Sequence, residues 1–95
     1  MDTKNVTKMA SGKALSELSR KKTVVGAKQL KRALQNGAAR YVFLALNADP
    51  AITEPIEALC RQSNVDYAWV RSMTDLGQAC GIEVGAAAAA AVKKY

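Results

Sequence analysis

The feature that most constrains the fold is a run of six consecutive alanines, Ala86 to Ala91, close to the end of a 95-residue chain. Alanine has the highest intrinsic helix propensity, so local rules favour a helix there. The run lies between Gly85 and a charged end, however, and a helix this short is unstable in isolation. The alternative is a central β-strand, because alanine side chains let helices approach a sheet closely on both faces. These residues alone leave both structures open.

The rest of the chain alternates helix and strand signals. Runs of β-branched and aromatic residues predict strands at 23–25, 41–46 and 66–71. Apolar spacing and end signals predict four helices. The first extends from Ser11 to about Lys21, and the second from Gly26 to Asn36-Gly37. The third has its N-cap at Thr53 with Pro55 in the first turn, and the fourth extends from an N-cap at Ser72 to Gly81. This alternation predicts an α/β fold, a three-layer α/β/α sandwich around a mixed sheet.

Length and charge narrow the possibilities. Residues 1–95 are enough for one domain, and we expect the polar residues 1–10 to be frayed. The formal net charge is +6, and residues 1–40 hold ten basic side chains against two acidic ones. A localised positive charge is typical of a surface that binds nucleic acid, although a basic surface without a specific partner has the same composition.

Several classes of protein are not favoured by the sequence. No apolar run reaches the roughly 20 residues of a membrane span, and the N-terminus has no secretory signal, so we expect a cytoplasmic protein without a membrane partner. Cys60 and Cys80 form neither a disulfide framework nor a zinc motif. The chain has no histidine, no P-loop and no G-x-S-x-G motif. We therefore expect no catalytic residue, no metal and no cofactor.

The segment GAKQLKRALQNG, residues 26–37, combines an apolar stripe with a polar face at helical spacing. The polar face holds four side chains at i, i+3, i+4 and i+7: Lys28, Lys31, Arg32 and Gln35. Gly26 stands at a strand-to-helix turn, where backbone amides and the helix dipole favour an anion. Lys28 and Gln29 can reach base edges from the first turn. A solvated basic helix would show the same pattern.

The segment LGQACGIEVG, residues 76–85, places Ile82, Glu83 and Val84 between two glycines. An exposed Ile and Val beside a basic surface can hold an unstacked base, because RNA is often recognised through splayed nucleotides. In the structural alternative, Ile82 and Val84 begin the apolar pattern of the last strand.

Three segments in this order, TVVGAKQLKRAL, ALNADP and VRSMTDLGQACGIEVGAAAAA, resemble the kink-turn-binding family. That family includes large-subunit ribosomal proteins, a spliceosomal protein, the core protein of box C/D and H/ACA ribonucleoproteins, and short bacterial members, which this chain resembles most. The resemblance extends from about Thr23 to Val92, and the LG-x-A-CG-x-x-V segment is its most specific part.

The resemblance implies a four-stranded mixed sheet in which residues 86–92 form the last strand. It also implies that the RNA is a kink-turn, a sharply bent internal loop with tandem sheared G·A pairs. The family signature G-x-N-E-x-x-K falls on Gly26, Lys28, Gln29 and Arg32. The RNA-binding residues expected from the resemblance are Gly26, Ala27, Lys28, Gln29, Lys31, Arg32, Ile82, Glu83 and Val84, the last three packing on a flipped-out nucleotide.

Two residues depart from the signature, since Lys28 replaces asparagine and Gln29 replaces glutamate. The short bacterial members carry a similar lysine–glutamine pair, which implies that binding is retained. Glutamine offers one acceptor oxygen where glutamate offers two, so discrimination for guanine is expected to be weaker.

The sequence favours a non-catalytic protein that binds nucleic acid, and the resemblance implies a monomeric RNA-binding protein that recognises a kink-turn and is associated with the ribosome. The expected partners are structured RNA, ribosomal RNA among the candidates, and ribosomal or ribonucleoprotein components. The alternative is a ribosome-associated interaction or assembly module without kink-turn specificity, docking through Ile82, Val84 and Trp69. Binding that survives high salt would favour the alternative, because phosphate contacts weaken as counterions are released.

Overall fold

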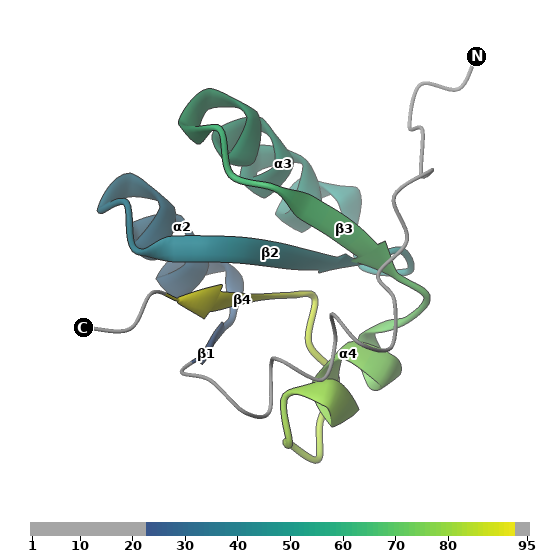
Figure 1. The fold of residues 1–95 in the computed structure, drawn as a ribbon. Coiled ribbons are helices and arrows are strands. Elements are labelled where there is room, and N and C mark those ends of the chain that lie inside the picture. Colours follow the sequence, from purple (N-terminus) through teal and green to yellow (C-terminus); the bar gives the residue numbers. More distant parts are fainter. Residues whose placement is uncertain (1–22, 93–95) are drawn as a thin grey trace.

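The computed structural model describes residues 23–92, and four strands and three helices lie within them (Figure 1). The strands are β1 (Thr23–Val25), β2 (Ala39–Ala45), β3 (Tyr67–Val70) and β4 (Ala88–Val92). The helices are α2 (Ala27–Gln35), α3 (Pro50–Ser63) and α4 (Met73–Ala79). The predicted helix over 11–21 and the predicted frayed residues 1–10 lie outside the described residues.

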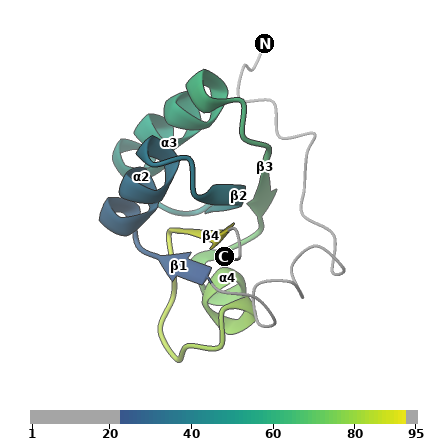
Figure 2. The ribbon, with the colours of Figure 1, turned by 60° about the vertical axis from the view of Figure 1, so that its left-hand side comes forward.

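The strands form one mixed sheet in the order β1-β4-β2-β3. Strand β4 pairs antiparallel with β1 and β2, whereas β2 and β3 are parallel. Helices α2 and α3 lie together on one face of the sheet and α4 lies on the other, as Figure 2 shows. The predicted three-layer α/β/α sandwich with a four-stranded mixed sheet is therefore confirmed.

Two apolar clusters hold the layers together. The cluster under α2 and α3 includes Leu30, Leu34, Val42, Leu44, Ile56 and Cys60. The cluster under α4 includes Phe43, Ala45, Val70 and Leu76. Successive residues of β2 point to opposite faces, so Val42 and Leu44 enter one cluster while Phe43 and Ala45 enter the other. A continuous apolar run is what a strand covered on both faces requires.

The alanine run forms a strand, as the family resemblance implied, and it lies in the interior of the sheet. Ala88 and Ala90 face α2 and α3, whereas Ala89 and Ala91 face the α4 side, and all four are at most 1% exposed. Hydrogen bonds to two neighbouring strands outweigh the helix propensity of alanine, which is worth less than about 1 kcal/mol per residue. The strand begins at Ala88 rather than at the predicted residue 86, because 86–87 belong to the loop that leads into it.

Strand bounds differ from the sequence prediction by one or two residues. Strand β2 begins at Ala39, since Ala39 pairs with Val92, and it ends at Ala45. Leu46, which was predicted to end this strand, lies in the following turn and is 39% exposed. Strand β3 is one residue shorter at each end than the predicted 66–71.

The predicted start of the third helix was wrong. Asp49 is the N-cap of α3, and its carboxylate accepts a hydrogen bond from the Ala51 amide at 2.9 Å. Pro50 occupies the first turn, where a missing N–H costs nothing. Thr53, the predicted cap, is buried inside the helix, and Pro55 is an interior residue of it. The helix therefore begins earlier than predicted, because the Asp49 side chain caps it and Pro50 fits its first turn.

The predicted ends of α2 and α4 are confirmed. After α2, the amide of Ala38 donates to the Ala33 carbonyl and that of Gly37 to Leu34, the hydrogen-bond pattern of a glycine-terminated helix. At the start of α4, the Ser72 hydroxyl accepts a hydrogen bond from the Asp75 amide at 3.1 Å. These ends depend on local chemistry, which sequence reasoning handles well.

The interior of β4 gives a test of close packing. We expect Ala90→Val to lower the free energy of unfolding by about 1–3 kcal/mol, because extra methyl groups have no space between the sheet and α2. Strand propensity alone predicts the opposite sign, since valine is the better strand former. Urea unfolding measures the difference, and Arg40→Val, at an exposed position of β2, is the control. Stabilisation by Ala90→Val would contradict the packing argument.

Candidate nucleic-acid interface

The strand directions bring four connecting segments to one end of the sheet. Strands β1, β2 and β3 all run the same way and β4 runs against them. The carboxyl ends of the first three strands therefore meet the amino end of β4. We call this region the loop end; it comprises Gly26 and the segments 46–49, 71–72 and 80–87, which precede or follow the strands there.

Backbone hydrogen bonds fix these segments to one another. The Gly26 amide donates to the Ala88 carbonyl at 3.1 Å, which sets the start of α2 beside the start of β4. The Ala45 amide donates to Ala87 at 2.9 Å. Segments far apart in the chain are thus held within one small surface.

The amino end of α2 is suited to an anion. Gly26 is its N-cap residue, with φ of 105°, a conformation that side chains disfavour. No side chain caps the helix and its first turn holds no acidic residue. The first intrahelical bond runs from Leu30 to Gly26, so the amides of 27–29 lie outside the helical pattern. Free amides and the positive end of the helix dipole attract a phosphate or a base oxygen.

The predicted polar side chains of α2 lie where they can reach a ligand. Lys28, Gln29 and Arg32 are exposed, Lys31 is half-buried, and Ala27 is half-buried at the first helical position. The opposite side of the helix buries Leu30 and Leu34. The predicted amphipathic arrangement is therefore present, and α2 contains no acidic residue that would neutralise its basic side chains.

The segment 80–87 rests directly on α4. A Cβ added to Gly77 would overlap the backbone oxygen of Val84, so only glycine permits this approach. The Ile82 amide donates to the Gly77 carbonyl at 3.0 Å. Gly77 therefore positions the segment that carries three of the predicted site residues.

The three predicted site residues of this segment differ in exposure. Val84 is 69% exposed and Glu83 is exposed, whereas Ile82 is half-buried and packs against the cluster under α4. None of the three belongs to β4, which begins at Ala88, so the alternative in which Ile82 and Val84 start the last strand does not hold. An exposed valine next to a half-buried isoleucine leaves an apolar surface on this segment.

Sequence reasoning did not identify three further exposed residues, two at the loop end and one in the helix that follows the segment 46–49. Leu46 and Ile52 are large apolar side chains, 39% and 38% exposed, and Arg71 is exposed directly after β3. Leu46 had been assigned to a buried strand, and Ile52 lies in the first turn of a helix that begins earlier than predicted. Their contribution to the surface depended on element bounds that the sequence did not settle.

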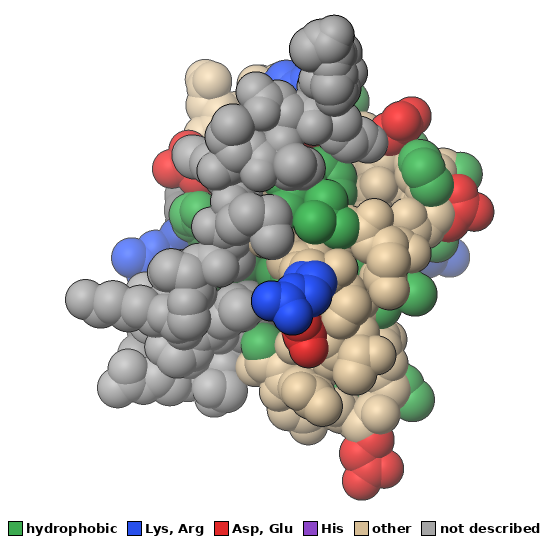
Figure 3. All heavy atoms as spheres, turned by 90° about the vertical axis from the view of Figure 1, so that its right-hand side faces the viewer, with side chains coloured by type: hydrophobic (Ala, Val, Ile, Leu, Met, Phe, Trp, Pro, Cys, Tyr) green, Lys and Arg blue, Asp and Glu red, His purple; other side chains and the backbone are tan. Residues whose placement is uncertain are grey.

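Figure 3 looks onto the right-hand side of Figure 1, where β2 and β3 end. A basic side chain beside an acidic one stands out among apolar and uncharged atoms.

Residues 23–92 as a whole hold six basic and six acidic side chains, so the net charge of +6 is contributed by residues outside them. Basic side chains therefore do not outnumber acidic ones in the described portion. Three of the six basic residues nevertheless lie on α2, namely Lys28, Lys31 and Arg32.

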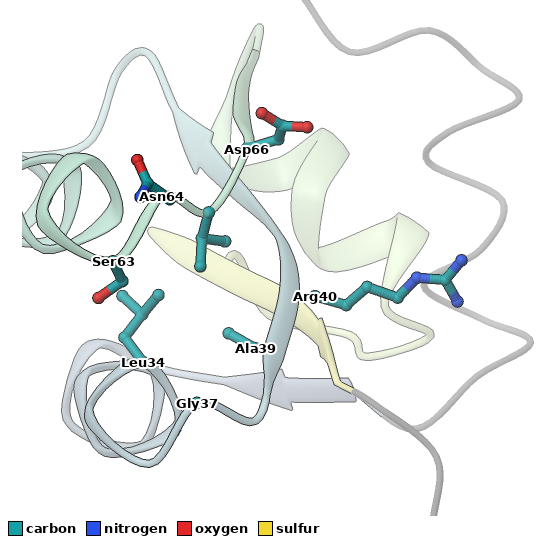
Figure 4. A pocket seen from close by; sticks show the side chains of 8 residues that line it. Leu34, Gly37, Ala39, Arg40, Ser63, Asn64 and Asp66 are labelled. Carbon is teal, nitrogen blue, oxygen red and sulfur yellow. The ribbon is translucent and has the colours of Figure 1, made fainter.

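A hollow of about 280 Å³ lies at the other end of the sheet, where α2 and α3 end (Figure 4). Leu34, Ala39 and Val65 contribute apolar atoms to it, and Ser63, Asn64 and Asp66 contribute polar ones. Arg40 points away from its centre in Figure 4. None of the predicted site residues lines this hollow.

The two cysteines do not form an activated site. Burial raises the pKa of the Cys60 thiol to about 12, with the charge of Glu57 adding to the effect. Burial also raises the pKa of Cys80. Both thiols therefore stay protonated near neutral pH, and the thiolate is the reactive form.

Residues 23–92 contain neither a membrane-spanning helix nor a metal-binding cluster. No helix in this range is long and apolar enough to cross a membrane. No group of three or more acidic or cysteine side chains in the same range is placed to hold a metal ion.

A family profile matches nearly all of the chain. The profile of the "Ribosomal protein L7Ae/L30e/S12e/Gadd45 family" matches residues 8–95. The matched range includes the predicted site residues on α2 and in the segment 80–87.

Several bacterial relatives are similar in sequence. The chain is 47% identical over 72 residues to a protein of Geobacillus sp. strain WCH70, covering 76% of this chain and 88% of the relative. It is 45% identical over 67 residues to a protein of Bacillus pumilus, covering 70% and 82%. Both relatives are named RNA-binding proteins.

Solved structures share the fold at lower identity. The 15.5kD RNA binding protein of Giardia lamblia superposes with a TM-score of 0.81 at 23% identity, covering 99% of this chain and 85% of that one. A protein with unknown function from Bacillus halodurans has a TM-score of 0.75 at 23% identity, covering 87% of each chain. At this identity the likeness shows the fold.

The contact between Gly77 and Val84 gives a second prediction. Helix propensity predicts that Gly77→Ala stabilises α4 by about 1 kcal/mol. We expect the reverse, a loss of about 1–3 kcal/mol, because the added Cβ displaces the segment 80–87 or strains the helix. Gln78→Ala, at an exposed position of the same helix, is the control. Thermal unfolding decides the sign, and a more stable Gly77→Ala variant would show that the segment does not rest on α4.

Proposed function

This chain belongs to the ribosomal protein L7Ae/L30e/S12e/Gadd45 family, and we propose that it is a non-catalytic RNA-binding protein that recognises a kink-turn. The observation that carries the proposal is the meeting, at one end of the sheet, of an uncapped basic helix start and an exposed apolar segment. A kink-turn presents phosphates, sheared base edges and an unstacked nucleotide together.

The amino end of α2 supports contact with the RNA backbone and with base edges. Gly26 carries no side chain, so the backbone of an RNA strand can approach it closely. Lys28 and Gln29, exposed in the first turn, offer donors and an acceptor to the sheared pairs. Arg32, exposed one turn further along, is suited to a phosphate or a base edge.

The segment 80–87 supports contact with an extruded base. Val84 is the most exposed large apolar residue of the described chain, and an exposed apolar side chain can pack against a splayed base. Ile82 is half-buried against the cluster under α4, so only part of its side chain is open to a base. Glu83 lies exposed between them, where its carboxylate can accept a hydrogen bond from a base or a sugar.

The distribution of charge along the chain determines which residues can attract RNA electrostatically. Since the described residues carry equal numbers of basic and acidic side chains, general attraction to phosphate has to come largely from the basic residues outside 23–92. Within the described residues, affinity then depends on the position of the α2 side chains more than on total charge. This arrangement favours shape-dependent recognition over binding to any duplex.

The ribosome is the proposed setting. The family is described as one of ribosomal proteins, and the bacterial relatives are named as RNA-binding proteins. Ribosomal RNA and other structured RNAs are the partner classes that fit, with the protein acting as a monomer. Sedimentation of the protein with ribosomal subunits, at low and at moderate salt, tests this part of the proposal separately.

The α2 side chains give a direct test. We expect Lys28→Ala and Arg32→Ala each to weaken binding of a kink-turn hairpin by about 1–3 kcal/mol, because each removes a charged contact to a base or a phosphate. Stability should change by less than about 0.5 kcal/mol, since both side chains are exposed. Arg40→Ala, which removes the same charge at the far end of the sheet, is the matched control. Equal losses for all three variants would indicate non-specific attraction.

The identity of the RNA gives a sharper test. Replacing the tandem G·A pairs by Watson–Crick pairs removes edges that only the kinked form presents, and we expect a loss of several kcal/mol, taking each lost contact at about 1–3 kcal/mol. End-to-end fluorescence transfer on doubly labelled RNA reports bending and affinity together. Binding of the Watson–Crick duplex within a few-fold of the kink-turn would instead indicate an assembly module without kink-turn specificity.

A further inference from the structure

Met73, the first residue of α4, connects three segments of the loop end. Its backbone amide donates to the side-chain oxygen of Asn47 at 2.8 Å, across 26 positions of sequence. Its backbone carbonyl accepts from the Ala86 amide at 3.0 Å. The segments 46–49, 71–72 and 80–87 are thus linked in series through one residue.

Asn47 is not needed to start the helix. Ser72 is the N-cap of α4 and its hydroxyl already accepts from the Asp75 amide. The contribution of Asn47 is a bond between segments, because its own backbone lies in the turn after β2. Gly85 packs against Met73 next to the carbonyl that accepts from Ala86, and a Cβ on Gly85 would come within 3.1 Å of the Met73 side chain.

We propose that Asn47 is a positioning residue for the RNA interface, holding Met73 and, through its carbonyl, the segment that carries Val84. The effect of Asn47 on RNA affinity rests on the proposed function, whereas the two hydrogen bonds of Met73 are properties of the protein itself. A surface held in its binding geometry before contact avoids the cost of ordering at contact. Asn47 would then affect affinity without touching the RNA.

The geometry also defines what substitutions should do. Asn47→Ala removes the acceptor and leaves the Met73 amide without its partner. Asn47→Asp has nearly the same shape and keeps an acceptor oxygen in place, and its charge faces the amino end of a helix. Gln62→Ala, which removes an exposed side-chain amide on α3, is the control for a general effect.

The first measurement uses the free protein. We expect the amides of Met73 and Ala86 to exchange with solvent about 2- to 10-fold faster in Asn47→Ala, the range expected for one modest hydrogen bond, and at the unaltered rate in Asn47→Asp and Gln62→Ala. Unchanged exchange of the Ala86 amide in Asn47→Ala would overturn the proposal, because the bond would then not hold the segment.

The second measurement is affinity for a kink-turn hairpin. We expect Asn47→Ala to bind about 2- to 10-fold more weakly and Asn47→Asp to recover affinity at moderate salt, where added charge is screened. Weaker binding by Asn47→Ala with normal exchange would mean that Asn47 contacts RNA directly, which also overturns the positioning role. If the unaltered protein does not distinguish the kink-turn from its Watson–Crick control, the proposed function fails, while the exchange data still decide the role of Asn47.

Discussion

The structure depends on the burial of β4 between two layers of helices. This strand pairs with β1 and β2, and four of its five side chains are alanines that are almost fully buried. Small side chains keep α2 on one face and α4 on the other close to the sheet, so both clusters form around the same strand. A larger residue in this strand would separate the layers, since protein interiors have little free volume.

The direction of β4 also brings together the residues of the candidate interface. Because it runs against its neighbours, the segment that precedes it arrives at the end of the sheet where β1 leads into α2 and where β2 and β3 also end. The basic helix and the apolar segment, some fifty residues apart in the chain, become neighbours for this reason. The positive φ of Gly26 lets the chain turn from β1 into α2, and Gly77 allows the backbone of Val84 to approach α4 closely.

The chemistry of the candidate interface depends on backbone groups that have no partner within the helix. The start of α2 has neither a side-chain cap nor an acidic residue, so its dipole and free amides face outward. The cysteine thiols, in contrast, are kept protonated by burial and contribute to packing. The described residues are therefore suited to binding by position and shape, with attraction at a distance supplied by charge elsewhere in the chain.

The sequence by itself determined the order of the elements from β1 to α4, the polar face of α2, and the helix ends at Asn36-Gly37 and Ser72, because caps and periodicity act over a few residues. It did not determine the alanine strand from propensity; the family resemblance was needed, since pairing with two distant strands reverses the local preference. Tertiary structure alone decided the start of α3 at Asp49, the exposure of Leu46 and Ile52, and the half-burial of Ile82. It also decided the bond between Asn47 and Met73, because a contact across 26 residues is set by the packing of whole elements and leaves no periodic signal in the chain.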